Sequence, residues 1–291
     1  MSADTFVDTR TIGDARVTVI SEETVRVSMS WTMDVPEAEW RAALPQIPPD
    51  GMDLFGQNVL HIALGGASIL IDAGLDAPDS AWGRRHAEQM QPERTPGTVA
   101  GLARIGVRPE EITHVLLTHG HWDHVVGATV ERDGTYVMRY PHARHYLGRA
   151  DWEQTLDDEL RLRLAAIERA GLLELVEGDL LVVPGVSLLH TPGESPGHHV
   201  VRLGSRGQSF YALSDLFHHP SEVEHLDWMG PGRDRAAMRR SRERLLPELA
   251  ARQATVVYTH ASFPPWGRIV ATPMGYRWQS TPGAPVADPG A

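Results

Sequence analysis

Four potential metal ligands lie within six residues of the chain, in a segment that reads His-x-His-x-Asp-His. Imidazole and carboxylate groups together suit zinc, iron or manganese. The segment follows an apolar run at 112–117 that predicts a buried strand. The cluster therefore lies where a strand runs out into a loop, a usual position for metal-binding and catalytic groups. Two of its residues can turn toward one point and two toward a second: His119 and His121, then Asp123 and His124.

Further candidates follow the ends of three later predicted strands. The loop after the first of these strands holds a carboxylate and three histidines, and each of the other two strands leads to one candidate. Strand ends that converge on one rim can build a site that no single motif could build. These candidates are Glu194, His190, His198, His199, Asp215 and His260.

The pattern His-x-His-x-Asp-His after an apolar strand resembles the metallo-β-lactamase superfamily. The resemblance covers about residues 58–270 and implies an α+β four-layer αββα sandwich with a one- or two-metal site at the sheet edges. Its motifs are an early Asp, the histidine cluster, a His in Thr-Pro-Gly-His, a bridging Asp and a late His. In this chain they fall on Asp72, 119–124, 191–194, Asp215 and His260.

The resemblance also implies how the metal ligands divide. They would hold two divalent ions, with zinc as the first expectation and manganese or iron as alternatives. Site one would be formed by His119, His121 and Glu194. Site two would be formed by Asp123, His124 and His260, with Asp215 as the bridge between the two sites.

One position departs from the family pattern, because Glu194 stands where the superfamily usually has a histidine. Glutamate binds the same metals through oxygen, and Glu194 alone occupies the matching position. His190, His198 and His199 are the rival third ligands, and His198 or His199 could instead orient a ligand. We expect Asp72 to support a ligand rather than to bind metal.

The chemistry that such a site would perform is hydrolysis. Two metal ions activate a water that attacks a carbonyl or phosphoryl centre, so no Ser or Cys nucleophile is required. We expect Asp123 to carry a proton to the leaving group and His219 to reach the substrate, whereas His218 and His225 are expected at the loop surface. The segments that contain Asp215 and His260 resemble those of lactonases and organophosphate hydrolases, so the first hypothesis is a hydrolase of lactones or small esters.

Other functions remain open at this point. Two histidines and one carboxylate are the ligands of non-haem iron oxygenases, and the superfamily includes mononuclear iron sulfur dioxygenases. The retained Asp123, His124 and His260 argue against a single metal. Phosphotriester hydrolase and β-lactamase activities are further alternatives, and a metal-free binding protein is the least favoured.

Composition excludes several classes of mechanism. The 291 residues include no cysteine and no lysine, so thiolate ligands, Schiff-base lysines and lysine-dependent phosphate loops are excluded. The formal net charge of −11 opposes binding to nucleic acid or to anionic membranes. We interpret the one basic cluster as a solvated helix face. It comprises Arg233, Arg235, Arg239, Arg240, Arg242 and Arg244.

The rest of the pattern predicts strands interleaved with helices. The sequence shows apolar runs for the strands and an apolar stripe for the helices. The predicted strands are 15–27, 112–117, 136–139, 143–146, 172–176, 180–183, 186–189, 200–203, 210–213, 255–258, 269–271 and 276–278, with a hairpin at 58–72. The predicted helices are 95–106, 151–170 and 234–252.

We expect a single domain over 1–279. Residues 28–57 are apolar and broken by prolines, which predicts an irregular segment that serves as a substrate lid or packs on the domain. The Pro/Gly/Ala-rich residues 280–291 predict a disordered tail. Residues 1–10 have no apolar core and no apolar run is membrane-length, so we expect a cytoplasmic protein without membrane contact. The expected partner is a small-molecule substrate, and a homodimer is left open.

Overall fold

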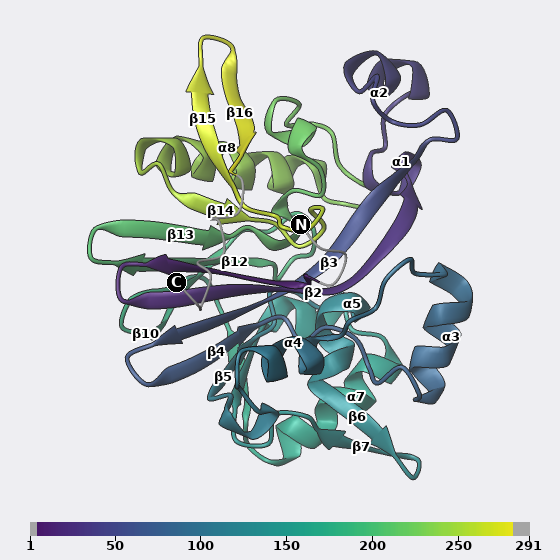
Figure 1. Ribbon diagram of the computed structural model, residues 1–291, viewed down its shortest axis with the longest axis vertical. Helices are drawn as coiled ribbons and strands as arrows, with labels where there is room; N and C mark the ends of the chain where they lie inside the picture. The colour runs from purple at the N-terminus through teal and green to yellow at the C-terminus, as the bar shows by residue number, and fades with distance from the viewer. Residues whose placement is uncertain (1–4, 282–291) are drawn as a thin grey trace, which may run out of the picture.

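Two seven-stranded mixed sheets stack face to face in the computed structural model, which describes residues 5–281, and helices cover the outer faces (Figure 1). The first sheet has the order β1-β2-β3-β4-β5-β8-β9. Its strands are Val7–Ile12, Ala15–Ser28, Met52–Leu64, Ala67–Ile71, His114–Leu116, Arg144–Gly148 and Leu173–Val176. The second sheet runs in order from β10 to β16. Its strands are Leu180–Val183, Val186–His190, His199–Ser205, Gln208–Ala212, Thr255–Val257, Gly267–Thr272 and Gly275–Ser280.

The helices lie on the two outer faces or at the ends of strands. In Figure 1, α8 covers the second sheet, whereas α4 and α7 lie on the far side of the first. A separate hairpin is formed by β6 (Thr129–Arg132) and β7 (Thr135–Met138). The helices are α1 Met29–Thr32, α2 Glu37–Ala43, α3 Ala81–Met90, α4 Thr98–Arg104, α5 Trp122–Val125, α6 Arg149–Gln154, α7 Asp158–Arg169 and α8 Arg235–Ala251.

Alternating side chains along the strands create the layers. In β4, Ile69 and Ile71 point into the core between the sheets, while Leu70 packs in the outer core under the helices. In β13, Phe210 belongs to the core between the sheets and Tyr211 packs in the outer core beneath α8. Successive residues of a strand face opposite sides, so strands that are apolar on both faces can be buried between two layers. The four-layer αββα sandwich predicted from the sequence is confirmed.

The predicted elements form, with corrections at three places. The segment 28–57 is not irregular throughout, because it contains α1 and α2 and its last residues, 52–57, belong to β3 and pair with the end of β2. The helix predicted at 151–170 is two helices, α6 and α7. Ser280 ends β16, so the predicted tail starts too early, and its remainder from 282 lies outside the described residues. The sequence pattern also missed β1, α3, α5 and β6, and Asp123 and His124 therefore lie on a short helix rather than on a loop.

The middle of β3 joins the first sheet to the loop after β14 in the second. The amide of Asn58 donates to the carbonyls of Thr259 and Ala261, both at 2.7 Å, and its backbone N–H also donates to Thr259. The backbone N–H of Gly56 donates to the carbonyl of His260 at 3.2 Å. A side chain at position 56 would place its Cβ 2.3 Å from the Ala261 carbonyl oxygen, so only glycine allows this approach.

No helix within residues 5–281 is both long enough and apolar enough to cross a lipid bilayer.

The Asn58 bridge can be tested by mutation. Asn58→Ala removes both side-chain hydrogen bonds and leaves the Ala261 carbonyl without this donor, whereas the Thr259 carbonyl keeps the backbone N–H of residue 58, so we expect the free energy of unfolding to fall by about 2–3 kcal/mol in urea titrations. The control is Gln208→Ala, which removes an exposed amide contact to the Gly13 N–H and is expected to change it by less than about 0.5 kcal/mol. Equal effects of the two substitutions would show that Asn58 does not join the sheets.

Candidate metal centre

The strand directions bring the candidate ligands to one edge of the sandwich. Strands β4, β5 and β8 run parallel, so the loops that follow them leave the first sheet on the same side. In the second sheet β13 and β14 are parallel, and β11 has the same direction because it is antiparallel to β12. The loops after β11, β13 and β14 therefore meet the loop after β5. The convergence predicted from the sequence is confirmed by this topology.

Asp72 orients one histidine of the cluster. It follows β4 and adopts a left-handed backbone conformation, with φ of 61°, that is uncommon outside glycine. Its Oδ1 accepts from the backbone N–H of Thr118 at 2.8 Å, and its Oδ2 accepts from Nδ1 of His124 at 2.8 Å. A histidine that donates through Nδ1 presents Nε2 for metal binding. Asp72 thus orients His124, a candidate ligand, and this contact agrees with the supporting role expected for Asp72.

Glu194 lies beside the first two histidines of the cluster. His119 Nε2 is 2.9 Å from His121 Nδ1, and His121 Nδ1 is 3.2 Å from Glu194 Oε1. Suitable donor atoms of these three residues all lie within 4.8 Å of one another. The loop after β11 therefore places a carboxylate where the sequence predicted the third ligand of site one.

The rival histidines of that loop are placed differently. His190 contacts the carbonyl of Pro196 at 2.9 Å, and His199 contacts the carbonyl of Gly178 at 3.0 Å. His198 is buried with its ring centroid 5.3 Å from that of His119, and its Nδ1 bonds to Thr191. Within the part of the chain that the structure describes, the Nε2 of His198 is buried without a hydrogen-bond partner, but His198 belongs to none of the groups of donor atoms that lie within 4.8 Å of one another.

Asp215 lies at the centre of the donor groups. It follows β13, directly after Ser214, whose φ of 48° is another uncommon left-handed conformation. Its Oδ2 is 3.0 Å from His260 Nε2, 3.4 Å from His124 Nε2 and 3.8 Å from His119 Nε2. A single carboxylate oxygen therefore faces imidazoles of both predicted sites. The bridging role implied by the family resemblance matches this central position.

The second predicted group also gathers in the structure. Asp123 Oδ2 is 3.4 Å from His124 Nε2 and 3.6 Å from His260 Nε2. His260 Nδ1 donates to the carbonyl of Gly56 at 3.0 Å, which turns Nε2 toward the cluster. The ring of Phe55 stacks on His260 with centroids 4.2 Å apart and fixes its plane.

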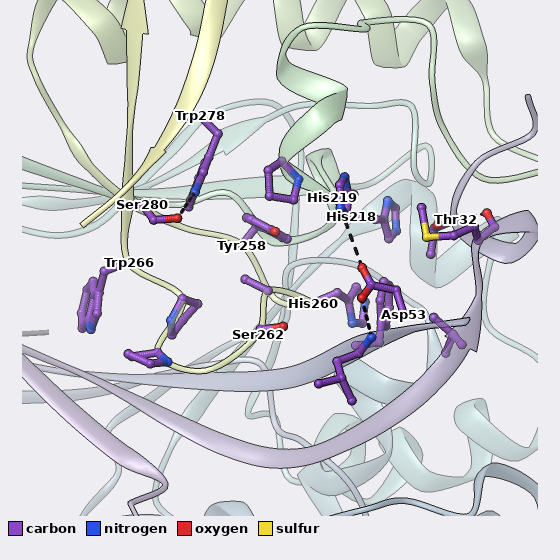
Figure 2. Close-up of a pocket in the computed structure, with 18 residues that line it drawn as sticks. Thr32, Asp53, His218, His219, Tyr258, His260, Ser262, Trp266, Trp278 and Ser280 are labelled. Atoms are coloured by element: carbon purple, nitrogen blue, oxygen red, sulfur yellow. Dashed lines mark hydrogen bonds and ion pairs between the residues drawn. The ribbon is translucent and has the colours of Figure 1, made fainter. Parts of the chain in front are cut away.

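The structure places His218, rather than His219, among these groups. His218 is buried and its Nε2 is 3.2 Å from Asp215 Oδ2, so the expectation that it lies at the loop surface is wrong. His219 faces Asp53, with 3.8 Å between Nε2 and Oδ2, in a neighbouring cavity of about 170 Å³ (Figure 2). His218 and His260 line this cavity, and they also line a second cavity that adjoins the cluster of candidate ligands and is described below.

Asp151, in α6, ties the two ligand loops together. Its carboxylate accepts from the backbone N–H groups of Gly120 at 2.8 Å and Gly197 at 2.7 Å. It also accepts from the hydroxyls of Ser195 at 2.7 Å and Thr155 at 3.1 Å. One fully buried carboxylate thereby fixes the loop of His119 and His121 relative to the loop of Glu194.

The electrostatics of the cluster favour a cation. Burial alone would raise the pKa of Asp215, but the charges of the imidazoles around it, His260 first, hold it well below its usual range. Burial alone would lower the pKa of His218, yet the carboxylates of Glu194 and Asp215 raise it to about 9. Asp215 thus remains ionised, and together with Glu194 it draws a proton onto His218. Divalent cations would satisfy the same charges.

Several buried nitrogen and oxygen atoms within residues 5–281 that could bind a metal ion have no hydrogen-bond partner, and this supports metal binding. Among the described residues, His124 Nε2, Asp215 Oδ1 and both ring nitrogens of His218 find no hydrogen-bond partner. Buried polar atoms are rarely left unsatisfied unless water or an ion serves them. Four overlapping groups of imidazole and carboxylate donors each lie within 4.8 Å, so these residues fit a metal centre of one or two ions.

A cavity of about 340 Å³ lies directly above the cluster. Its polar floor includes Asp123, Asp215 and Arg233. Its walls are largely apolar and come from the β2–β3 ribbon, α1, α3 and α5. They include Val25, Val27, Trp31, Phe55, Met90 and Trp122. Trp122, which is 40% exposed, therefore forms part of a cavity wall.

This combination of fold and site has a counterpart among known proteins. A family model described as the metallo-beta-lactamase superfamily matches residues 52–260. The chain belongs to this superfamily. The match contains every candidate ligand from His119 to His260, so the resemblance seen in the sequence is confirmed.

Curated relatives of this superfamily member include lactonases. An N-acyl homoserine lactonase from Bacillus sp is 34% identical over 97 residues, which cover 33% of this chain and 35% of the relative. Another from Bacillus cereus is 32% identical over 139 residues, which cover 45% of this chain and 51% of the relative. The chain thus matches about a third to a half of the length of these curated relatives.

Solved structures resemble nearly the whole chain. AidC, described as a dizinc quorum-quenching lactonase in complex with a product, has a TM-score of 0.81 at 19% identity and covers 96% of this chain and 98% of its own. The hydrolase AbOPH has a TM-score of 0.78 at 20% identity with the same coverage. At such identities the likeness shows the fold, which this superfamily member shares along nearly its full length.

The interpretation of the basic cluster as a solvated helix face is wrong for two of its members. Arg242 is fully buried and pairs with Glu222, and Arg233 pairs with Glu194 beside the metal centre. Arg235 and Arg239 are exposed, as expected. The helical spacing could have indicated that Arg242 lies on the same face as Met238 and Leu245. No local signal indicates the partner of Arg233.

The hydrogen bonds by which Asp151 joins the loop of His119 to the loop of Glu194, called the Asp151 clamp here, lead to a prediction. Asp151→Asn places an NH₂ group against donor groups, so we expect the free energy of unfolding to fall by about 2–4 kcal/mol and the metal content after dialysis to drop. Asp157→Asn, at the exposed N-cap of α7, is the control, because Asn caps a helix as well as Asp does. Wild-type metal content and stability in Asp151→Asn would contradict the clamp.

Proposed function

We propose that this protein is a metal-dependent hydrolase that opens a lactone or cleaves a small ester. The observation that carries the proposal is the position of Asp215, whose single oxygen faces imidazoles of two donor groups beneath an apolar-walled cavity. The relatives named as N-acyl homoserine lactonases support the lactone as the first substrate class. The likeness to AidC, a dizinc lactonase, supports zinc as the first metal.

The proposed ligands divide into two sets that share Asp215. When bound, two divalent ions would activate a water and polarise the carbonyl oxygen of the substrate. Zinc is the first expectation, and manganese or iron are alternatives. The proposed sets are His119, His121 and Glu194, and Asp123, His124 and His260.

The chain's own residues perform three tasks in this proposal. Asp72 and the Gly56 carbonyl hold His124 and His260 with Nε2 toward the cluster. Asp123 lines the cavity, and although burial raises its pKa, the charges of nearby imidazoles, His124 first, hold it below the usual range. Its ionised carboxylate can therefore accept a proton and pass it to the leaving oxygen. The apolar walls exclude water and hold the rest of the substrate.

The β2–β3 ribbon and α1 form the upper walls of the cavity, which agrees with a role for residues 28–57 in covering a bound substrate. Trp31, at the start of this segment, is 61% exposed although it lines the cavity. The segment packs through its own small apolar cluster, which includes Met33, Trp40 and Trp228. A lid that closes over the substrate stays a prediction.

The alternatives differ in the number of metal ions and in the substrate. A mononuclear iron sulfur dioxygenase would need one set of ligands, whereas Asp123, His124 and His260 gather into a second set here. Phosphotriester hydrolysis and β-lactam hydrolysis use the same chemistry on other electrophiles.

Metal analysis of the purified protein, with a hydrolysis screen, tests the proposal. The screen covers lactones, aryl esters, phosphotriesters and β-lactams, and oxygen consumption is followed with thiol substrates. We expect about two metal ions per chain, turnover of lactones or esters, and loss of turnover after treatment with a chelator. Full hydrolysis by protein shown to be free of metal would contradict the proposal, as would oxygen consumption without hydrolysis.

Removal of the shared carboxylate gives a second prediction. We expect Asp215→Ala to lose metal and at least about 100-fold in kcat/KM, because both sets of ligands lose a member. Asp227→Ala is the matched control, since Asp227 is an exposed carboxylate paired with Arg239. Turnover within a few-fold of wild type in Asp215→Ala would remove Asp215 from the bridging position.

A catalytic role for His219 stays a prediction that the same assay tests. His219 lies toward Asp53, whereas its neighbour His218 contacts Asp215. If His219 reaches the substrate, His219→Ala lowers turnover while the metal content is unchanged. If only His218→Ala lowers turnover, His219 has no part in the reaction.

A further inference from the structure

Glu194 is held by a guanidinium group as well as by the histidine cluster. Arg233 donates from Nη2 to Glu194 Oε1 at 2.6 Å and from Nε to Glu194 Oε2 at 2.8 Å. Such two-point pairing fixes both the position and the plane of a carboxylate. The side chain of Glu194 is fully buried, and that of Arg233 is 23% exposed.

The backbone places Arg233 at this position. Arg233 directly precedes Asp234, the N-cap of α8, and the Asp234 N–H donates to the carbonyl of Gly193 at 3.0 Å. A Cβ at Gly193 would lie 2.3 Å from the Cα of Met238, so the loop of Glu194 touches the first turn of α8. Arg233 Nη1 also donates to the carbonyl of Pro231 at 2.9 Å. The start of α8 thus carries the arginine to the carboxylate.

The pairing leaves one face of Glu194 for the cluster. A carboxylate oxygen has two lone pairs, and the arginine uses one on each oxygen. Oε1 is also 3.2 Å from His121 Nδ1, so this oxygen faces the imidazoles. Arg233 therefore occupies the rear of the carboxylate while Oε1 remains beside His119 and His121.

The pairing with Arg233 also changes the net charge that Glu194 brings to the metal centre. An imidazole ligand is neutral, whereas Glu194 adds one negative charge to its donor group. The guanidinium of Arg233 remains charged at all physiological pH values and cancels that charge at a distance of one hydrogen bond. The pair as a whole is therefore neutral toward a cation, as a single imidazole would be.

We propose that Arg233 is a positioning residue for the metal centre, which holds the Glu194 carboxylate with Oε1 toward His119 and His121 and cancels its charge. The inference rests on the metal site of the proposed function. Glu194 and Arg233 act as one unit, so neither can be exchanged alone without leaving an unpaired charge next to the site.

The experiment is a double-mutant cycle measured on the full chain with and without zinc. The variants are E194H, R233M and E194H/R233M. The control is R235M, which removes an exposed arginine two residues along that contacts Asp34 rather than Glu194. Zinc affinity is measured by competition with a chromophoric chelator, and the unfolding temperature is measured on the metal-free protein.

The pairing predicts which of the two E194H variants binds zinc more tightly. E194H leaves the Arg233 charge unpaired beside three imidazoles, which repels a cation. We therefore expect E194H/R233M to bind zinc at least about tenfold more tightly than E194H. Equal zinc affinities of E194H and E194H/R233M would overturn the inference.

The unfolding temperature of the metal-free protein is a measurement that does not depend on metal binding. R233M removes the two-point pairing and leaves the buried carboxylate with His218 as its nearby cation, 3.7 Å from Oε2, so its unfolding temperature should fall by about 2–4 °C. In the E194H background the same R233M change should not lower it, because no carboxylate loses a partner. If the R233M protein does not fold but the E194H/R233M protein does, that result would support the pairing of Arg233 with Glu194.

An equal loss of unfolding temperature in both backgrounds would show that Arg233 is merely structural, and an effect of R235M as large as that of R233M would show the same. A wild-type protein that binds no zinc, manganese or iron would overturn the proposed function. In that case the metal-free cycle alone would still decide whether Arg233 is the counter-charge of Glu194.

Discussion

A buried carboxylate must be matched by positive charge, and Asp215 imposes this requirement on the rest of the structure. An ionised group with no counter-charge costs several kcal/mol inside a protein. Asp215 is 2% exposed and meets His260, His124 and His218 at 3.0 to 3.4 Å. These histidines come from loops after three different strands, so the match exists only when both sheets are stacked in register. The fold is thus tied to the charge balance at its rim.

Around this centre, several of the candidate ligands or their loops are held by groups that do not belong to the proposed ligand sets. Asp72 holds His124, the Gly56 carbonyl holds His260, and Asp151 joins the loops of the two sheets. Such supporting groups fix the orientation of a ligand before any cation arrives, which lowers the entropy lost on binding. Arg233 belongs to the same layer and differs in that it also corrects a charge.

The sequence predicted those parts of the site that depend on local order. His119 to His124 follow one apolar strand, and Asp215 and His260 each follow another, so parallel strand ends brought them together. The sequence could not distinguish His218 from His219, because adjacent residues after a strand point to opposite sides and the turn that follows decides which side is inward. Arg233 could not be assigned, since its partner lies 39 positions earlier in the chain. Similarly, 52–57 became strand only through pairing with the distant end of β2.

The division of the donor groups between the two sheets has a mechanical consequence. His119, His121, Asp123 and His124 extend from the first sheet, whereas Glu194, Asp215 and His260 extend from the second. A cation held by both sets would cross-link the two sheets at this edge of the sandwich, and it would join segments that are far apart in the chain. Loss of that cation would remove this link, and the two sheets would then be joined at this edge by protein contacts alone. The edge of the sandwich would therefore open more readily in the metal-free protein than in the metal-loaded protein.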